Sequence, residues 1–112
     1  MSAESEKIAL LNDLMRKHRL GRWLITPGVD ALSDQEAIIQ KVSQFDTFPP
    51  GDNPYGQRDF GAFDHNGNRI LWKIDYYAPP VGHPDNLEYG SEDPGDLEKT
   101  VRVLTIMLSH EY

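Results

Sequence analysis

The stretch from Asp59 to Tyr77, DFGAFDHNGNRILWKIDYY, constrains the fold more than any other part of the chain. It is the densest aromatic and β-branched segment, and Asn66-Gly67 lies between its two alternating runs. Asn-Gly is the strongest short-range signal for a two-residue type I′ turn, because both turn residues need a positive φ. The segment therefore predicts a β-hairpin whose register is fixed by the turn.

In this register Trp72 lies opposite Gly61, where an aromatic ring can cover exposed backbone. Two opposite-charge pairs are also predicted across the strands, Asp64 with Arg69 and Arg58 with Asp75. Side chains alternate across a strand, so the two faces of the hairpin differ. The core face is expected to carry Phe63, Ile70, Trp72, Ile74 and Tyr76, and the half-exposed face Phe60, Leu71, Lys73, Asp75 and Tyr77.

Two helices are expected before the hairpin. The first covers residues 1–19, where apolar residues keep helical spacing and the last turn is basic. The second begins at Ser33, because Ser33 and Glu36 form an S-x-x-E capping box. A short β-branched run at residues 22–26 predicts a strand between the two helices, ended by the Pro-Gly turn that follows it.

Proline- and glycine-rich composition predicts irregular loops at residues 46–57 and 78–92. After the second loop, Asp93-Pro94 suits a helix start, and apolar residues repeat at helical spacing from Leu97 to Leu108. The β-branched residues of 101–106 also permit a strand, but the long, capped repeat favours a helix. The predicted fold is α+β, a single domain over residues 1–112 in the order α-β-α-β-β-α. Its antiparallel sheet is built on the central hairpin, with the helices packed on one face.

The composition excludes several classes of protein. The chain contains no cysteine, which removes disulfides, thiol chemistry and cysteine-ligated metal sites and fits a reducing cytoplasm. The N-terminal residues lack the basic and apolar segments of a signal peptide, and no run reaches the ~18 apolar residues that a membrane span needs. A soluble cytoplasmic protein, not a membrane protein, is therefore expected.

The formal charge of −7 is unevenly placed: seven acids and no base lie between Lys73 and Lys99. Nucleic-acid binders usually carry the opposite sign, so direct nucleic-acid binding is not expected. A negative field favours a partner protein with a basic surface, although the same residues also suit a solvated, repelling loop. The predicted binding residues are Asp85, Glu88, Tyr89, Glu92 and Asp93, with Tyr55 as a further exposed anchor.

The sequence contains no phosphate-binding loop and no G-x-S-x-G elbow, and its four histidines are far apart. No metal site and no cofactor are predicted. Asp75 on a central strand could act as a general base with a raised pKa, assisted by Tyr77 or Lys73. Pairing with Arg58 favours the charged form of Asp75 instead, and this structural interpretation is preferred.

The chain resembles a family of small bacterial proteins of unknown function, frequent in alphaproteobacterial genomes and often found on plasmids and integrated elements. The resemblance rests on the signature DFGAF…WKIDYY…RVLTIML…EY, with Leu11-Asn12-Asp13 and residues 26–29, 52–56, 90–91 and 93–94. It departs from the family pattern in the longer, proline-rich connection at residues 78–84. The resemblance implies a small domain with no established activity.

Two functions from different classes follow. The leading hypothesis is a small interaction protein that binds another macromolecule, with an accessory role for a mobile element implied by the resemblance alone. The alternative is an enzyme of unknown class that uses Asp75 with a nearby tyrosine, lysine or histidine. The sequence leaves homo-oligomerisation open.

Overall fold

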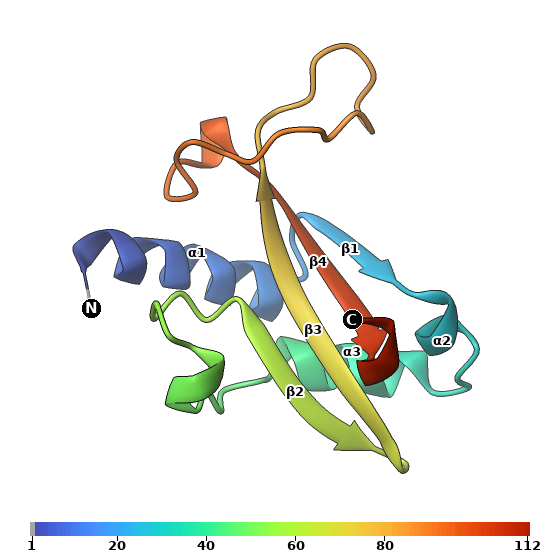
Figure 1. The fold of residues 1–112 in the computed structure, drawn as a ribbon. Coiled ribbons are helices and arrows are strands. Elements are labelled where there is room, and N and C mark those ends of the chain that lie inside the picture. The colour runs from blue at the N-terminus through green and yellow to red at the C-terminus, as the bar shows by residue number, and fades with distance from the viewer. Residues whose placement is uncertain (1) are drawn as a thin grey trace.

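Four strands form one mixed sheet in the order β1-β4-β3-β2 in a computed structural model that describes residues 2–112 (Figure 1). The strands are β1 (Arg22–Ile25), β2 (Phe60–His65), β3 (Asn68–Tyr77) and β4 (Val101–Leu108). Neighbouring strands are antiparallel except β1, which runs parallel to β4. The predicted α+β class is confirmed, whereas the expectation of a purely antiparallel sheet is wrong.

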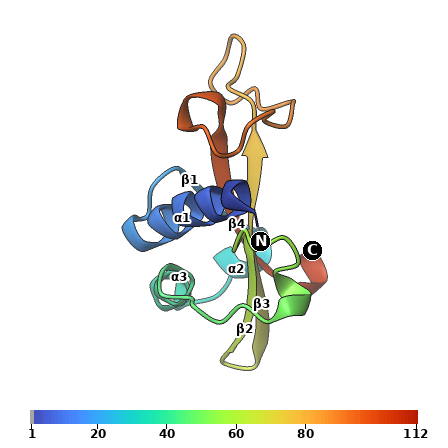
Figure 2. The same cartoon turned by 90° about the vertical axis from the view of Figure 1, so that its left-hand side faces the viewer.

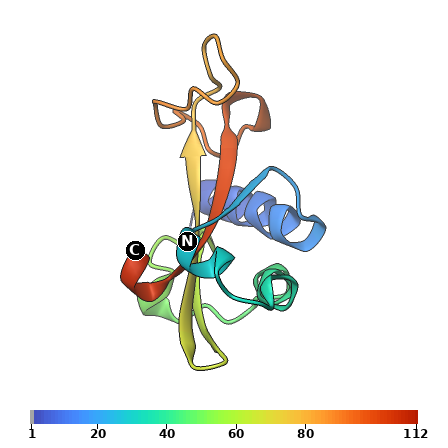
Figure 3. The same cartoon turned by 90° about the vertical axis from the view of Figure 1, so that its right-hand side faces the viewer.

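In residues 2–112, three α-helices accompany the sheet: α1 (Ala3–His18), α2 (Pro27–Asp30) and α3 (Gln35–Ser43). Figures 2 and 3 show α1 and α3 on the same side of the sheet. The irregular stretches contain the short 3-10 helices η1 (Pro50–Asp52), η2 (Leu97–Lys99) and η3 (Ser109–Glu111). Within residues 2–112 no α-helix covers the opposite face of the sheet, which we call the open face, although Val103 and Met107 of β4 are buried on it by neighbouring side chains.

Helix α1 matches its prediction closely. Ser2 is the N-cap, and its hydroxyl accepts a hydrogen bond from the Ser5 amide at 3.0 Å. The helix ends at His18, and the C-cap Arg19 adopts the left-handed conformation with φ of 52°. The expected first residue, Met1, lies outside the described residues. Strand β1 also forms where it was predicted, but the expected Pro-Gly turn after it is the first turn of α2.

The predicted hairpin register is confirmed for every pair from Phe60–Lys73 to His65–Asn68. Asn66 and Gly67 both have positive φ, 49° and 80°, as a type I′ turn requires. Asp64 and Arg69 form the expected ion pair at 3.3 Å, on the exposed tip of the hairpin. The turn therefore sets which side chains of β2 and β3 face the helices.

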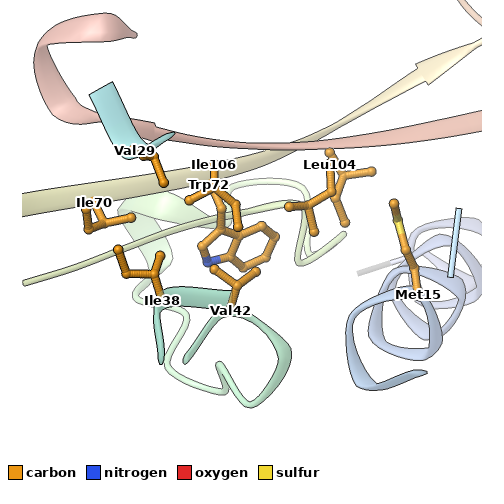
Figure 4. Close-up of a cluster of buried hydrophobic side chains, with 9 residues drawn as sticks. Met15, Val29, Ile38, Val42, Ile70, Trp72, Leu104 and Ile106 are labelled. Carbon is orange, nitrogen blue, oxygen red and sulfur yellow. The ribbon is translucent and has the colours of Figure 1, made fainter. Parts of the chain in front are cut away.

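The core is built around Trp72, which is fully buried together with Ile70 on the same face of β3. Figure 4 shows the indole between Ile38 and Val42 of α3 and the strands, with Met15 of α1 to one side. A Cβ atom at Gly61 would overlap the indole nitrogen and lie 2.9 Å from the Phe45 ring. Only glycine at position 61 therefore leaves room for the indole.

The last long element is a strand, β4, and not the predicted C-terminal helix. Residues 102–104, 106 and 107 are all buried, so β4 is a central strand covered on both faces. A strand of this kind is a nearly continuous apolar run, and such a run matches helical spacing by default. The Asp93-Pro94 helix start is wrong as well: the only helical turn there is η2, and Asp96 caps it by accepting from the Glu98 amide at 2.9 Å.

The predicted capping box at Ser33 is wrong. Helix α3 begins at Gln35 with Asp34 as its N-cap, and no side chain caps it. The Asp34 carboxylate is instead bound by the hairpin tip, where it accepts from Asn66 Nδ2 at 2.8 Å and contacts His65 Nε2. A tertiary contact between α3 and the hairpin has replaced the local cap.

The predicted ion pair between Arg58 and Asp75 is also wrong. Strand pairing extends one residue beyond β2, since the Ile74 amide donates to the Asp59 carbonyl at 2.8 Å. Arg58, however, has a φ of 51°, which turns its side chain away from β3. Its guanidinium binds Asp13 of α1, with Nη2 2.7 Å from Oδ2, while Asp75 pairs with Lys73 at 3.0 Å.

Glu111 of η3 holds three segments of the chain together. Its carboxylate accepts from Thr26 Oγ1 at 2.6 Å, the Gly28 amide at 3.0 Å and the Leu108 amide at 2.8 Å. These hydrogen bonds, with the one from Thr26 as the largest cause, hold the pKa of Glu111 below its ordinary value of 4.5. Glu111 thus fixes the start of α2 against the end of β4.

We expect Gly61→Ala to lower the free energy of unfolding by ~1–3 kcal/mol, because the new methyl group forces Trp72 and Phe45 out of their packed positions. Urea denaturation followed by tryptophan fluorescence measures the loss. Gly51→Ala is the matched control: a Cβ there meets nothing within 4 Å, so its midpoint should not change. Equal midpoints for both variants would show that the indole does not need the space above Gly61.

We expect Glu111→Gln to lower the melting temperature at pH 7. A carboxylate with a depressed pKa stabilises the fold above its unfolded-state pKa and loses this effect as the pH falls through its folded-state pKa. The difference between wild type and variant should therefore shrink as the pH falls below the ordinary value of 4.5. Glu88→Gln, on the exposed loop, is the control; a Glu111 effect independent of pH would contradict the assignment.

Candidate functional site

No catalytic residue was predicted, but the three candidates of the enzyme alternative lie together. Lys73, Asp75 and Tyr77 alternate along β3 and share the open face of the sheet, where they line a hollow of about 510 Å³. Lys73 Nζ is 3.0 Å from Asp75 Oδ2, and this hydrogen bond raises the pKa of Lys73. An ammonium held protonated by a carboxylate is the reverse of what a nucleophilic or basic lysine needs. The geometry favours a structural ion pair over the enzyme alternative.

Tyr55 lies beside this open face and not beside the other predicted binding residues, which lie between residues 85 and 93. It lines a second hollow, of about 420 Å³, together with Phe60 and Tyr112. Lys73 and Asp75 line both hollows, so the two are neighbours. The structure therefore separates Tyr55 from the other predicted binding residues.

Those other residues, Asp85, Glu88, Tyr89, Glu92 and Asp93, lie in the connection between β3 and β4. We call residues 78–99 the acidic end; Figure 1 shows it projecting beyond the end of β3. Residues 89–91 of the acidic end pair with the end of β3. The Ala78 amide donates to the Tyr89 carbonyl at 2.7 Å, and the Ser91 amide donates to the Tyr76 carbonyl at 3.0 Å.

The far part of the acidic end is also held in place. Arg22 of β1 donates to the Pro84 carbonyl at 2.7 Å and lies 3.7 Å from Asp85. The Asn86 side chain donates to the Val81 carbonyl at 3.2 Å, and the Asn86 amide to the His83 carbonyl at 3.0 Å. The acidic end is therefore a folded surface with a defined shape.

Within residues 2–112 no group of three or more histidine, cysteine, aspartate or glutamate side chains could hold a metal ion. The same part of the chain contains no helix that is long and apolar enough to cross a membrane.

Residues 25–111 match the family described as protein of unknown function DUF3768. The chain belongs to the DUF3768 family. No curated protein and no solved structure matches it. The match includes all of β2, β3 and β4 and the acidic end, and it begins after α1.

A buried polar cluster joins α1 to residues 25–111, the part of the chain that matches DUF3768. The sequence analysis did not predict this cluster. Asn12 of α1 is fully buried and donates to Tyr76 Oη at 2.8 Å. Tyr76 in turn donates to Asp59 Oδ2 at 3.0 Å, and Asn12 Oδ1 accepts from Arg102 Nε at 2.8 Å. Nothing in the spacing of these residues indicates that they meet.

A second part of this cluster is ionic. Asp13 binds Arg58 and also Arg16 Nη2, the latter at 2.8 Å. Arg16 is 2% exposed, and its Nη1 donates to the Phe45 carbonyl at 2.6 Å. These contacts hold α1 against residues 25–111, because they pair charged side chains that would be costly to bury without a partner. Their role is structural.

Burial shifts two ionisable groups of the cluster. It raises the pKa of the Asp59 carboxyl above its ordinary 3.8, and it raises the pKa of the Tyr76 hydroxyl. Both shifts favour the neutral form, so Tyr76 stays a hydrogen-bond donor to Asp59 near neutral pH.

We expect Asp59→Asn to gain stability relative to wild type as the pH rises from 4 to 7. A carboxyl with a raised folded-state pKa stabilises the fold below its unfolded-state pKa and loses this effect as the pH rises through the folded-state value. The asparagine oxygen can still accept from Tyr76 without this cost. Urea denaturation at several pH values measures the difference, with Asp64→Asn on the exposed hairpin tip as control. A difference that stays constant with pH would place Asp59 in a solvated environment.

Proposed function

We propose that this DUF3768 chain is an interaction protein that binds a partner protein with a basic surface through the acidic end. The observation that carries the proposal is the balance of charges from residue 49 to the C-terminus. This half of the chain contains eleven acids and five bases. The sign of the surface charge therefore depends on whether these five bases are ion-paired, buried or free.

Every one of these bases is neutralised or buried within the described part of the chain. Arg69, Lys73 and Lys99 form ion pairs with neighbouring acids at 3.3, 3.0 and 3.8 Å. Arg58 binds Asp13, and Arg102 is 6% exposed. Within residues 2–112, seven of the eleven acids form no ion pair, and four of these seven, Glu88, Asp93, Asp96 and Glu98, belong to the acidic end.

Apolar side chains lie among these acids. Val81, Tyr89 and Leu97 are 84%, 72% and 65% exposed. Interfaces commonly combine a tyrosine anchor with a charged rim, and complementary charge mainly speeds the encounter of the partners. A basic protein segment with apolar residues fits this surface, whereas a nucleic acid would be repelled by it.

The cellular setting is part of the proposal. We place the protein in the cytoplasm, which is supported by the absence of cysteine. An accessory role for a mobile genetic element is supported only by the resemblance of the chain to proteins encoded on plasmids and integrated elements. Neither setting changes the chemistry of the acidic end.

We expect amide substitution of four acids, D85N/E88Q/E92Q/D93N, to slow association with a synthetic lysine- and arginine-rich peptide by roughly tenfold at low salt, because electrostatic steering raises association rates by about 10 to 10³. The effect should disappear at 1 M salt, where the Debye length is about 3 Å. Stopped-flow mixing at two salt concentrations measures both quantities.

The control carries the same change of net charge elsewhere: D30N/E36Q/D46N/D64N, all exposed residues outside the acidic end. This variant should bind the peptide at nearly the wild-type rate. If the two variants slow association equally, the acids act only through net charge and the proposed surface is wrong. Circular dichroism melting curves confirm that both variants are folded.

A further inference from the structure

A hollow of about 520 Å³ lies between α1, the α1–β1 connection and the start of β4. Its walls are largely apolar and come from three parts of the chain, which are brought together only in the fold. This volume is within the range of small-molecule sites, roughly 300–1,000 Å³. The apolar lining residues are Leu11, Leu14, Met15, Leu20, Leu97 and Val101.

Three of these leucines are exposed although they are large and apolar. Leu14 is 48% exposed, Leu20 53% and Leu97 65%. None of them belongs to the hydrophobic core around Trp72. Exposed apolar side chains that gather around one hollow often mark a binding site.

Arg102 lines the same hollow and is a buried cation without a counter-ion. Its Nε donates to Asn12 Oδ1 at 2.8 Å and its Nη2 to the Pro94 carbonyl, but its Nη1 is buried and has no hydrogen-bond partner. Within residues 2–112 no carboxylate lies within ion-pair distance of it. Arg16 and Arg58 differ in having a counter-ion, since both bind Asp13, although Arg16 Nε is likewise buried without a hydrogen-bond partner.

An isolated buried charge is expensive, and so is an unsatisfied buried donor. Burial lowers the pKa of Arg102, in agreement with this cost. Nη1 has no contact with solvent, so an anionic group in the hollow must displace the atoms that cover it; once next to Nη1, it would remove both penalties. A carboxylate is the natural choice, because its planar oxygens match the guanidinium fork.

We propose that this hollow binds an amphipathic carboxylate, a small molecule with a single apolar chain and one carboxylate group. The carboxylate lies deepest, against Arg102, and the chain lies along the exposed leucines. Asp96 and Glu98 flank Leu97 at the edge of the hollow, so an anionic head at the mouth would be repelled. This site borders the acidic end and shares Leu97 with it, but the proposal rests on Arg102 and on the leucines of α1 and the α1–β1 connection, which the proposed interaction does not use.

The test compares dodecanoate with 1-dodecanol, which has the same chain without the charge, by isothermal titration calorimetry below the micellar concentration. We expect dodecanoate to bind at least roughly tenfold more tightly, because hydrogen bonds to charged groups are stronger than those between neutral groups. The methyl signals of Leu14, Met15, Leu97 and Val101 should shift in ¹H–¹³C spectra on binding.

Arg102→Met removes the buried charge and should abolish the preference for dodecanoate over dodecanol while keeping dodecanol binding. Arg69→Met is the matched control, since it removes an arginine from the exposed hairpin tip and should keep the preference. If Arg102→Met does not fold, Leu14→Asn still tests the site: Leu14 is half-exposed, and its loss should weaken binding of both ligands.

Three results would overturn the proposal. The first is the absence of dodecanoate binding to the wild-type protein. The second is equal affinity for dodecanoate and dodecanol. The third is binding whose chemical shifts map to the open face of the sheet around Lys73 and not to the leucine-lined hollow.

Discussion

The packing of Trp72 on Gly61 is the contact on which the rest of the structure depends. It exists because the Asn66-Gly67 turn fixes the register of β2 and β3, and a slip of one residue would turn the indole to the open face. Phe45 and Phe48, which follow α3, pack edge-on against the indole with ring centroids 5.6 and 6.1 Å away. Arg16 of α1 lies over the same ring at 5.0 Å. Trp72 therefore contacts residues of α1 and residues that follow α3. Its own position is determined by the two-residue turn between β2 and β3.

What could be predicted from the sequence is what short-range chemistry determines. The hairpin register, α1 and β1 depend on turn residues, capping and local spacing, and all three form as expected. Residues 101–108 could not be assigned correctly, because an apolar run buried on both faces satisfies the helical and the extended pattern alike. The capping box failed for a different reason: Asp34 became the N-cap, and its carboxylate was taken by a hairpin tip about thirty residues away in the chain. Local signals give way where a distant partner offers a better contact.

The candidate sites divide in the same way. An excess of acids can be counted in the sequence, so the acidic end was expected, but its shape depends on Arg22 reaching the Pro84 carbonyl. The cluster of Asn12, Tyr76, Asp59 and Arg102 could not be expected, since its members come from α1, from strands β3 and β4, and from the residue before β2. Tyr76 was placed correctly on the core face, yet its hydroxyl partner was not foreseeable. Buried side chains that hydrogen-bond to each other across a core produce no periodic pattern in the amino-acid sequence.

Within the described residues, four acids of the acidic end and the buried Arg102 lack a counter-ion, but they differ in their effect on stability. Solvated acids cost little, because water and salt stabilise them, so an acidic surface is compatible with binding and also with simple solubility. A buried arginine without a counter-ion reduces stability, and an apolar side chain of similar size in its place is often neutral or stabilising. Arg102 keeps this cost beside a hollow lined with exposed leucines, where an apolar residue would extend the existing surface. An anion bound next to Nη1 would offset this cost, in addition to the contacts that Arg102 makes with Asn12, the Pro94 carbonyl and the Tyr76 ring.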